Sequence, residues 1–222
     1  MHNINIRSGI CESIMRLFRI KEMQMSTQEK MCAIVFEEMS LKHGIKYDQT
    51  NDEVEGFEDF GATGGSKLHA DHTLVFMVRG LSTNWKQPIP DVLSRGPTKS
   101  AILQSVIHNI KQIGLTPKIV ICDQGTNNRS IMKRLGVTTA QPFFHLEGLK
   151  IFAMFDPPHL IKNIRNNLKR NRFLFNDRIV SWQFFDKFYD MDSTLPICMA
   201  PKLTKRHISM SAFAHLRVSL AV

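Results

Sequence analysis

The sequence predicts an α/β fold with a mixed sheet and flanking helices. The first observation behind this prediction is that three short apolar runs each end on an acidic residue, as buried strands do at the edge of a sheet. The second is that segments with the apolar spacing of amphipathic helices lie between and after these runs. The runs and their acids are residues 31–36 with Glu37, 118–122 with Asp123 and 149–155 with Asp156. Three such acids indicate one polar site at one edge of one sheet.

Length and cysteine usage narrow the class of protein. The chain has 222 residues, enough for one full domain and part of another. No apolar run approaches the roughly 18 residues that span a bilayer, so no membrane association is expected. The four cysteines are far apart in sequence and form no C-x-x-C pair. Reduced thiols in an intracellular protein are therefore expected, rather than a disulfide framework or a zinc site.

The charge is positive and unevenly distributed. The net charge is +9 and the pI about 9.6, which is compatible with a polyanionic partner. Residues 48–59 are acidic, and residues 162–178 are basic. No secretory signal is visible, and Glu12, Glu22 and Glu29 argue against a mitochondrial presequence.

The first part of the chain is predicted to be a helix followed by a strand. Residues 9–30 have helical apolar spacing, and an S-x-x-E pattern at Ser26 and Glu29 indicates a helical turn there. Residues 31–36 form the first predicted strand. Residues 41–68 are polar, acidic and glycine-bearing, and we expect a long excursion with little regular structure.

Two motifs in and after this excursion resemble ligand sites only weakly. Residues 61–67 (GATGGSK) lack the glycine spacing of a phosphate-binding loop, so a flexible loop is the better interpretation. His69, Asp71 and His72 could together ligate a metal, but the spacing is a weak signal. A polar entry into the next strand is favoured.

The middle of the chain alternates strands and helices. Residues 73–81 and 85–93 are predicted antiparallel strands, the second an edge strand because of Pro88 and Pro90. A helix capped by Thr98 follows. This helix ends at Gly114. A strand at 118–122, a helix at 127–135 and a strand at 149–155 are predicted after it.

A basic helix is predicted after Asp156. Asp156 is a suitable N-cap, and Pro157 suits the first helical position because its missing N–H is not needed there. Cations lie mostly on the face opposite the apolar residues, which indicates either a solvated face or phosphate binding. The candidate nucleic-acid-binding residues are Lys162, Arg165, Lys169 and Arg170. From residue 173 the pattern is helical and aromatic, and residues 211–222 are predicted to be a helix.

The acids suggest metal-dependent phosphodiester chemistry. Two-metal cleavage needs carboxylates that hold two Mg²⁺ ions about 3.5–4 Å apart. Glu37 and Asp123, at the ends of adjacent predicted strands, are the candidate catalytic and metal-binding pair. For Asp156, a helix N-cap is favoured over a metal role.

Several motifs, in order along the chain, resemble the P-element-type DNA transposases, which include the THAP-domain transposases of animals. They are Phe36–Leu41 (FEEMSL), Gly56–Asp59 (GFED), Val75–Leu81 (VFMVRGL), Trp85–Ile89 (WKQPI), Cys122–Asn128 (CDQGTNN), Phe155–Asn167 (FDPPHLIKNIRNN) and Pro201–Ile208 (PKLTKRHI).

The resemblance implies an RNase H-like catalytic domain interrupted by a GTP-binding insertion. It implies a helical segment at 1–30, an incomplete RNase H-like domain at 31–170 and the truncated start of the insertion at 171–222. The family uses a D-D-E set of acids with Mg²⁺. The second Asp corresponds to Asp123, and the first to Glu37, where the family pattern is Asp-Glu-Met. The third acid and the THAP domain have no counterpart in this sequence.

Two functions follow from this resemblance. The first is a fragment of a P-element-like transposase, with Mg²⁺-dependent DNA cleavage and strand transfer by ancestry. Its expected partners are DNA transposon ends and further copies of itself, its expected location is the nucleus, and GTP is a ligand of the full-length family. The alternative is a domesticated or decayed remnant without catalysis, which binds nucleic acid or a protein partner.

Overall fold

The computed structural model describes residues 12–209, with gaps at 43, 50–51, 61–63 and 97–99. The chain divides into two compact units, Met1–Met154 and Phe155–Val222. The sequence placed a division after residue 170, whereas the contacts group helix α4 (Pro157–Arg170) with the second unit. Within the described residues, no helix is long and apolar enough to cross a membrane.

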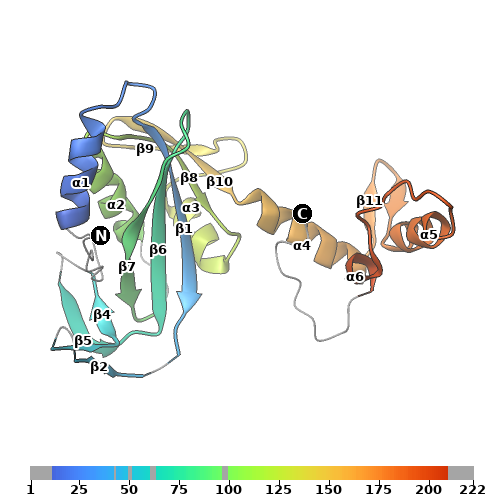
Figure 1. Cartoon of the computed structure of the whole chain (residues 1–222), viewed down its shortest axis with the longest axis horizontal. Coiled ribbons are helices and arrows are strands. Elements are labelled where there is room, and N and C mark those ends of the chain that lie inside the picture. The colour runs from blue at the N-terminus through green and yellow to red at the C-terminus, as the bar shows by residue number, and fades with distance from the viewer. Residues whose placement is uncertain (1–11, 43, 50–51, 61–63, 97–99, 210–222) are drawn as a thin grey trace. The chain divides into compact units, whose positions relative to one another are not determined.

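The first unit contains an eight-stranded mixed sheet, which confirms the predicted fold class (Figure 1). The strand order is β5-β4-β7-β6-β1-β8-β10-β9. Strand β1 pairs antiparallel with β6 and parallel with β8. The bounds are β1 Met31–Ser40, β4 Phe57–Asp59, β5 Gly65–His69, β6 His72–Gly80, β7 Lys86–Ser94, β8 Thr116–Cys122, β9 Phe143–Leu146 and β10 Leu149–Phe155.

The core is built on the central strands. In β1, Ile34 and Phe36 are buried, and in β6 Leu74 and Phe76 are buried. The rings of Phe36 and Phe76 lie 5.8 Å apart between centroids. Burying such side chains is the main favourable term in folding, and it explains why the predicted strand runs are almost continuously apolar.

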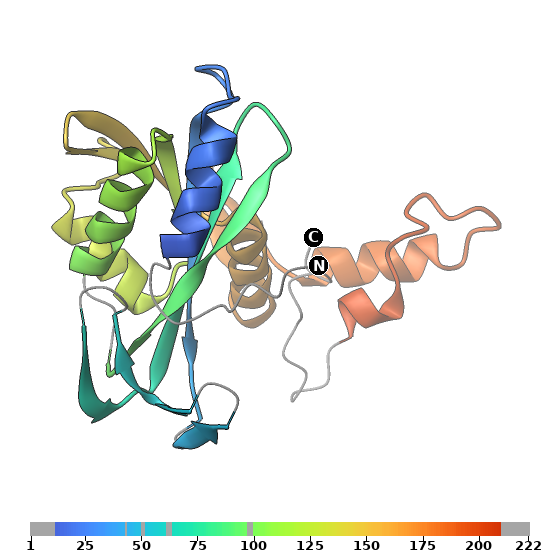
Figure 2. The same cartoon turned by 60° about the vertical axis from the view of Figure 1, so that its left-hand side comes forward.

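Three helices flank this sheet: α1 Glu12–Glu22, α2 Ser100–Gln112 and α3 Thr126–Arg134. Helix α2 buries the apolar face that the sequence predicted, and Gly114 follows it with a φ of 98°. Helices α1 and α2 lie side by side in both views (Figures 1 and 2). In α1, Phe18 is buried against Trp85, with the rings edge to face at 6.1 Å.

The predicted N-terminal helix is shorter in the structure. Of residues 9–30, residues 12–22 are helical, and residues 9–11 lie outside the described part. The predicted turn at Ser26 is confirmed, because the Ser26 amide donates to Glu29 Oε2 (2.9 Å) and the Glu29 amide donates to Ser26 Oγ (3.4 Å). Thr98, the predicted cap of α2, lies outside the described residues.

The prediction of little regular structure in residues 41–68 is wrong. Strands β2 (Lys46–Asp48) and β3 (Glu53–Glu55) form a hairpin, and β4 and β5 extend the main sheet. These strands are short and polar, so they carry no hydrophobic periodicity. Strands β2 and β3 pair with each other, and β4 pairs with β5 and with the more distant β7. Of the glycine-rich loop, residues 61–63 are not described, and residues 65–67 belong to β5.

Strand β7 is not the outermost strand, which corrects the prediction from its prolines. It pairs with β6, where Pro88 faces Met77, and β4 lies on its other side. The described pair with β4 is Asp59 with Leu93, beyond the prolines. A proline has no N–H to donate, so pairing past the prolines avoids a lost ladder hydrogen bond.

The second unit begins with α4, followed by β11 Phe173–Phe175, β12 Arg178–Val180, α5 Gln183–Asp192 and α6 Lys205–Ile208. The sequence predicted helix from residue 173, whereas β11 and β12 form a hairpin. Asn176 and Asp177 form its turn with φ of 48° and 59°, a conformation that Asn and Asp tolerate better than most residues. The predicted helix at 211–222 lies outside the described residues.

The sheet core gives a direct test of the fold with two leucines. Leu74 is 1% exposed in β6, and Leu68 is 47% exposed in β5. We expect Leu74→Ala to lower the free energy of unfolding by about 2–5 kcal/mol, because it removes buried methyl groups and leaves a cavity. The matched control, Leu68→Ala, is expected to change it by no more than about 0.5 kcal/mol. Equal effects in urea denaturation would contradict the described burial.

Candidate functional site

Pairing of β1 with β8 places Glu37 level with Asp123. The last described pair on this parallel ladder is Val35 with Ile121, and both acids lie two residues further on. Asp123 lies one residue beyond the end of β8, and continuing the period-two alternation of strand side chains from Val35 and Ile121 assigns both acids to the same face of the sheet. The register therefore places the two acids that the sequence proposed as a pair at the ends of neighbouring strands.

An irregularity in this ladder sets the alignment. Cys32 pairs with Pro117, but Ala33 pairs with Ile119, so β8 contributes one extra residue, Lys118. Before this shift the partners differ by 85 positions (117 − 32), and after it by 86 (119 − 33). Proline cannot donate to a ladder and is found at such irregularities. Without the extra residue, Glu37 would stand level with position 122, a buried cysteine, and not with Asp123.

The carboxylate of Asp123 is held by the start of α3. Its Oδ1 accepts hydrogen bonds from the Gly125 amide (2.9 Å) and from Asn128 Nδ2 (2.6 Å). A carboxylate only accepts, so this contact also identifies the Asn128 atom that faces it as the amide nitrogen. Asn128 is 2% exposed. No described residue donates to the other oxygen, Oδ2, which leaves that oxygen available to a ligand.

The neighbouring asparagine binds the end of β1. Asn127 Nδ2 donates to Glu38 Oε2 (2.8 Å), so consecutive residues of α3 contact the acid-bearing ends of both strands. Glu37 itself is exposed and has no ion pair or hydrogen bond among the described residues. The sequence motif contained both asparagines, but nothing in it assigned them this role. The available signal was their place in the first turn of a helix directly after Asp123.

Metal binding fits these residues in part. Carboxylate oxygens are the ligands that Mg²⁺ prefers, and Glu37 and Asp123 supply them from adjacent strands. Within the described ranges, no group of three or more His, Cys, Asp or Glu side chains comes together. Burial raises the pKa of Cys122 to about 12, and the nearby Asp123 charge adds to this. Cys122 therefore stays a neutral thiol and is not expected to bind metal.

Asp156 caps helix α4, as the sequence favoured. Its Oδ2 accepts from the His159 amide (3.3 Å), and Pro157 occupies the first helical position. This contact accounts for Asp156 without a metal role.

Two of the four candidate nucleic-acid-binding cations have internal partners. Arg165 is 9% exposed and donates to the carbonyl oxygen of His207, and Lys169 Nζ donates to Ile208 O (2.5 Å). Both cations lie over the ring of Trp182, at 5.2 and 5.0 Å from its centroid. Burial is the main cause that lowers the pKa of each.

These contacts correct the interpretation of α4 as a uniformly solvated cationic face. Arg165 and Lys169 join α4 to the end of α6 within the second unit. Lys162 is half-buried and Arg170 exposed, and for these two residues nucleic-acid binding stays a prediction.

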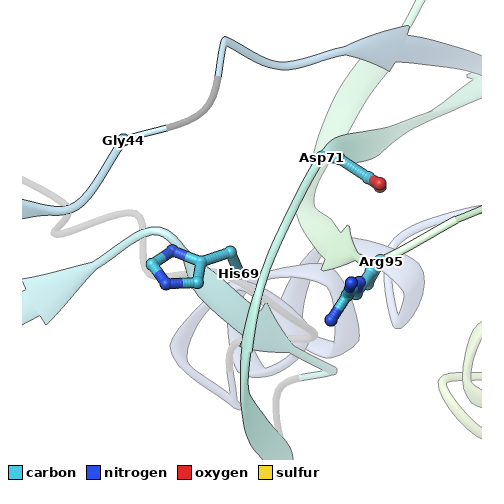
Figure 3. Close-up of a pocket in the computed structure, with 4 residues that line it drawn as sticks. All are labelled: Gly44, His69, Asp71 and Arg95. Atoms are coloured by element: carbon cyan, nitrogen blue, oxygen red, sulfur yellow. The ribbon is translucent and has the colours of Figure 1, made fainter.

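A separate hollow of about 670 Å³ lies in the first unit (Figure 3). Gly44, His69, Asp71 and Arg95 line it. Asp71 Oδ1 accepts from the Gly96 amide (2.6 Å) and contacts His72 Nδ1 (2.6 Å). The hydrogen bond with His72 is the main cause that lowers the pKa of Asp71. Asp71 and His72 stand at the entry to β6, as the sequence favoured.

Two family models match this chain. Residues 6–136 match the "TNP-like, RNase H N-terminal domain", and residues 158–222 match the "TNP-like, GTP-binding insertion domain". The chain belongs to the TNP-like family. This match confirms the resemblance that the sequence motifs indicated. The boundary between the two matched regions falls near the division of the TNP-like chain into its two units.

Curated relatives and a solved structure agree with this assignment. The TNP-like chain is 25% identical to the transposable element P transposase of Drosophila melanogaster over 197 residues, 87% of this chain and 24% of the relative. It is 26% identical to the DNA transposase THAP9 of Homo sapiens over 171 residues, 68% of this chain and 18% of the relative. The chain therefore spans about a quarter or less of the length of these relatives.

The solved structure confirms the RNase H-like fold. The TNP-like chain superposes on the Drosophila P element transposase strand transfer complex with a TM-score of 0.80 and 22% sequence identity. The match covers 99% of this chain and 47% of the solved one.

The contact between Asn128 and Asp123 can be measured by a double-mutant cycle. A hydrogen bond to a charged group contributes about 1.5–3 kcal/mol, so we expect Asn128→Ala and Asp123→Ala to be coupled by about that amount in the free energy of unfolding. In the control cycle, Asn167→Ala replaces Asn128→Ala, because the Asn167 side chain is exposed and donates to Asn163 O in the second unit. That cycle is expected to be additive within about 0.5 kcal/mol. A coupling as small as in the control would show that Asn128 does not hold the carboxylate.

Proposed function

We propose that this chain is the catalytic-domain portion of a P-element-like DNA transposase, with Glu37 and Asp123 as its first two metal-binding carboxylates. The observation that carries the proposal is the parallel ladder that sets the two acids level on one face of the sheet. Family membership supports the transposase role, and the relatives named above support DNA as the substrate.

In this proposal Glu37 and Asp123 hold Mg²⁺. Bound there, Mg²⁺ supplies electrostatic stabilisation of phosphate oxygens and lowers the pKa of a coordinated water. Asp123 presents Oδ2, because its other oxygen is occupied by Gly125 and Asn128. Holding one oxygen fixes the direction of the other, so this residue meets its ligand without first losing side-chain freedom.

The side chain of Glu37 is longer and less constrained than that of the Asp in the family pattern. It has one methylene more than the Asp of the family pattern and no described partner that orients it. A displacement of about 1 Å can cost on the order of a hundredfold in rate, so this position sets the efficiency of the site. For the second unit we propose GTP as the ligand, on the strength of the match of residues 158–222.

A nicking assay tests the site. We expect Asp123→Asn and Glu37→Gln to abolish Mg²⁺-dependent nicking of supercoiled DNA by the purified chain, because each change removes a ligand charge but keeps the side-chain size. Asp190→Asn and Glu55→Gln are matched controls on exposed residues that are not members of the pair, and they are expected to retain activity. Nicking that survives in Asp123→Asn would show that the site is assigned wrongly.

A second candidate function is binding of nucleic acid or protein without cleavage. The observation that favours it is that, among the described residues, no group of three or more His, Cys, Asp or Glu side chains comes together. It predicts that the wild-type chain binds DNA but does not nick it with Mg²⁺. The same assay, run beside a DNA-binding measurement, therefore separates the two functions.

A further inference from the structure

The hollow lined by Gly44, His69, Asp71 and Arg95 lies at the same end of the sheet as the acid pair. On the β1–β6 ladder, Glu37 faces Val75 and Ser40 faces His72. The backbone amide of Leu41, the next residue, donates to Asp71 O (2.8 Å). Ser40 lies three positions after Glu37, about 10 Å along β1. Arg95 lies further away, directly after β7, which is two strands over from β1. Strands β4 and β5 lie at this same end (Figure 1).

The walls of the hollow are held by backbone contacts. Gly56 has a φ of 111°, and a Cβ there would lie 2.4 Å from the carbonyl oxygen of Gly44, so these two segments are packed without space for a side chain. His69 pairs with Phe57 across β5 and β4, with ring centroids 5.4 Å apart. These contacts set the position of one side of the hollow before any ligand arrives.

The other side is held through Glu58. Its Oε1 accepts from the Arg95 amide (2.7 Å), and its Oε2 accepts from Ser66 Oγ (2.7 Å). This contact fixes the backbone of Arg95 and leaves its guanidinium exposed. No described residue pairs with that guanidinium.

The charges of the hollow suit an anion. Among the described residues that line the hollow, Asp71 is the acidic one, and the Gly96 amide and His72 already bind its carboxylate. His69 and Arg95 are both exposed and supply hydrogen-bond donors to the same hollow (Figure 3). The planar guanidinium matches two oxygens of a phosphate, and an imidazole N–H donates in either protonation state.

We propose that this hollow binds the backbone phosphate of a DNA strand that extends from the acid pair. The inference rests on the proposed function for the identity of its ligand. A DNA strand has phosphates at regular intervals, so a strand positioned at Glu37 and Asp123 needs cationic contacts a short distance away. The hollow supplies them at the same end of the sheet, whereas two of the described cations of α4 donate to backbone carbonyl oxygens.

DNA binding by the full chain tests the proposal. The affinity for a labelled duplex is measured by fluorescence anisotropy between about 50 and 200 mM salt. We expect Arg95→Ala to weaken binding about tenfold and to reduce the salt slope by about 0.9, as loss of one phosphate contact does. His69→Ala is expected to weaken binding, because it removes a hydrogen-bond donor from the hollow. Circular dichroism verifies that each variant is folded.

The matched control is Arg79→Ala. Arg79 is also exposed, but it faces Ala33 near the start of β1, at the opposite end of the sheet. It is expected to leave affinity and slope unchanged. Arg95→Lys is expected to retain the salt slope, because it keeps the charge. It is expected to lose part of the affinity, because lysine cannot make the bidentate contact of the guanidinium.

The results separate this inference from the proposed function. Equal slopes for Arg95→Ala and the wild type, or equal losses for Arg95→Ala and Arg79→Ala, would overturn the hollow as a phosphate site, and so would a wild-type chain that does not bind DNA. If Arg95→Ala lowers affinity as expected but the wild type never nicks DNA, the hollow stands and the catalytic proposal fails. If Asp123→Asn loses nicking while keeping DNA affinity, both stand.

Discussion

The parallel pairing of β1 and β8 is the contact on which the candidate site depends. Parallel neighbours need a long crossover, and here the crossover contains the β6–β7 hairpin and α2. The apolar runs of both strands bury their side chains, and this burial fixes the register, since a slip by one residue would turn every side chain to the other face. The extra residue after Pro117 sets the final alignment, because it moves Asp123 into line with Glu37. Helix α3 then secures the arrangement through Asn127 and Asn128.

The parts that the sequence predicted well are those with a local signal. Strand β1 and helix α2 have apolar periodicities over many residues, and Asp156 and Pro157 mark a helix start in two adjacent positions. The acids Glu37 and Asp123 were found because each follows an apolar run directly. That they stand level could not be predicted, because the ladder irregularity at Pro117 depends on the partner strand and has no signature within β8 alone.

The parts that the sequence missed depend on distant partners. The strands β2 to β5 are three to five residues long and polar, so they carry no hydrophobic periodicity, and β4 and β5 join the main sheet only through the pairing of β4 with β7. In the second unit, Arg165 and Lys169 have the spacing of a solvated helical face, yet they bind carbonyl oxygens about 40 residues away in sequence. A buried cation needs such acceptors, and Trp182 beneath it adds a cation–π contact. Helical periodicity shows which residues share a face, but not whether that face meets solvent.

The electrostatics of the sheet end explain why the acids and the cationic hollow belong together. Two neighbouring carboxylates repel the phosphates of a DNA strand. Before a metal binds, this repulsion opposes the positioning of the strand at the acid pair. A chain with net charge +9 attracts DNA at long range, but that attraction does not fix a register. A phosphate held at Arg95, on a backbone that Glu58 already fixes, sets the register without placing a cation beside the acid pair, where it would compete with Mg²⁺ for the same oxygens. In the proposed arrangement, the separation of the cationic hollow from the two carboxylates lets one end of the sheet bind a polyanion without a cation beside the acids.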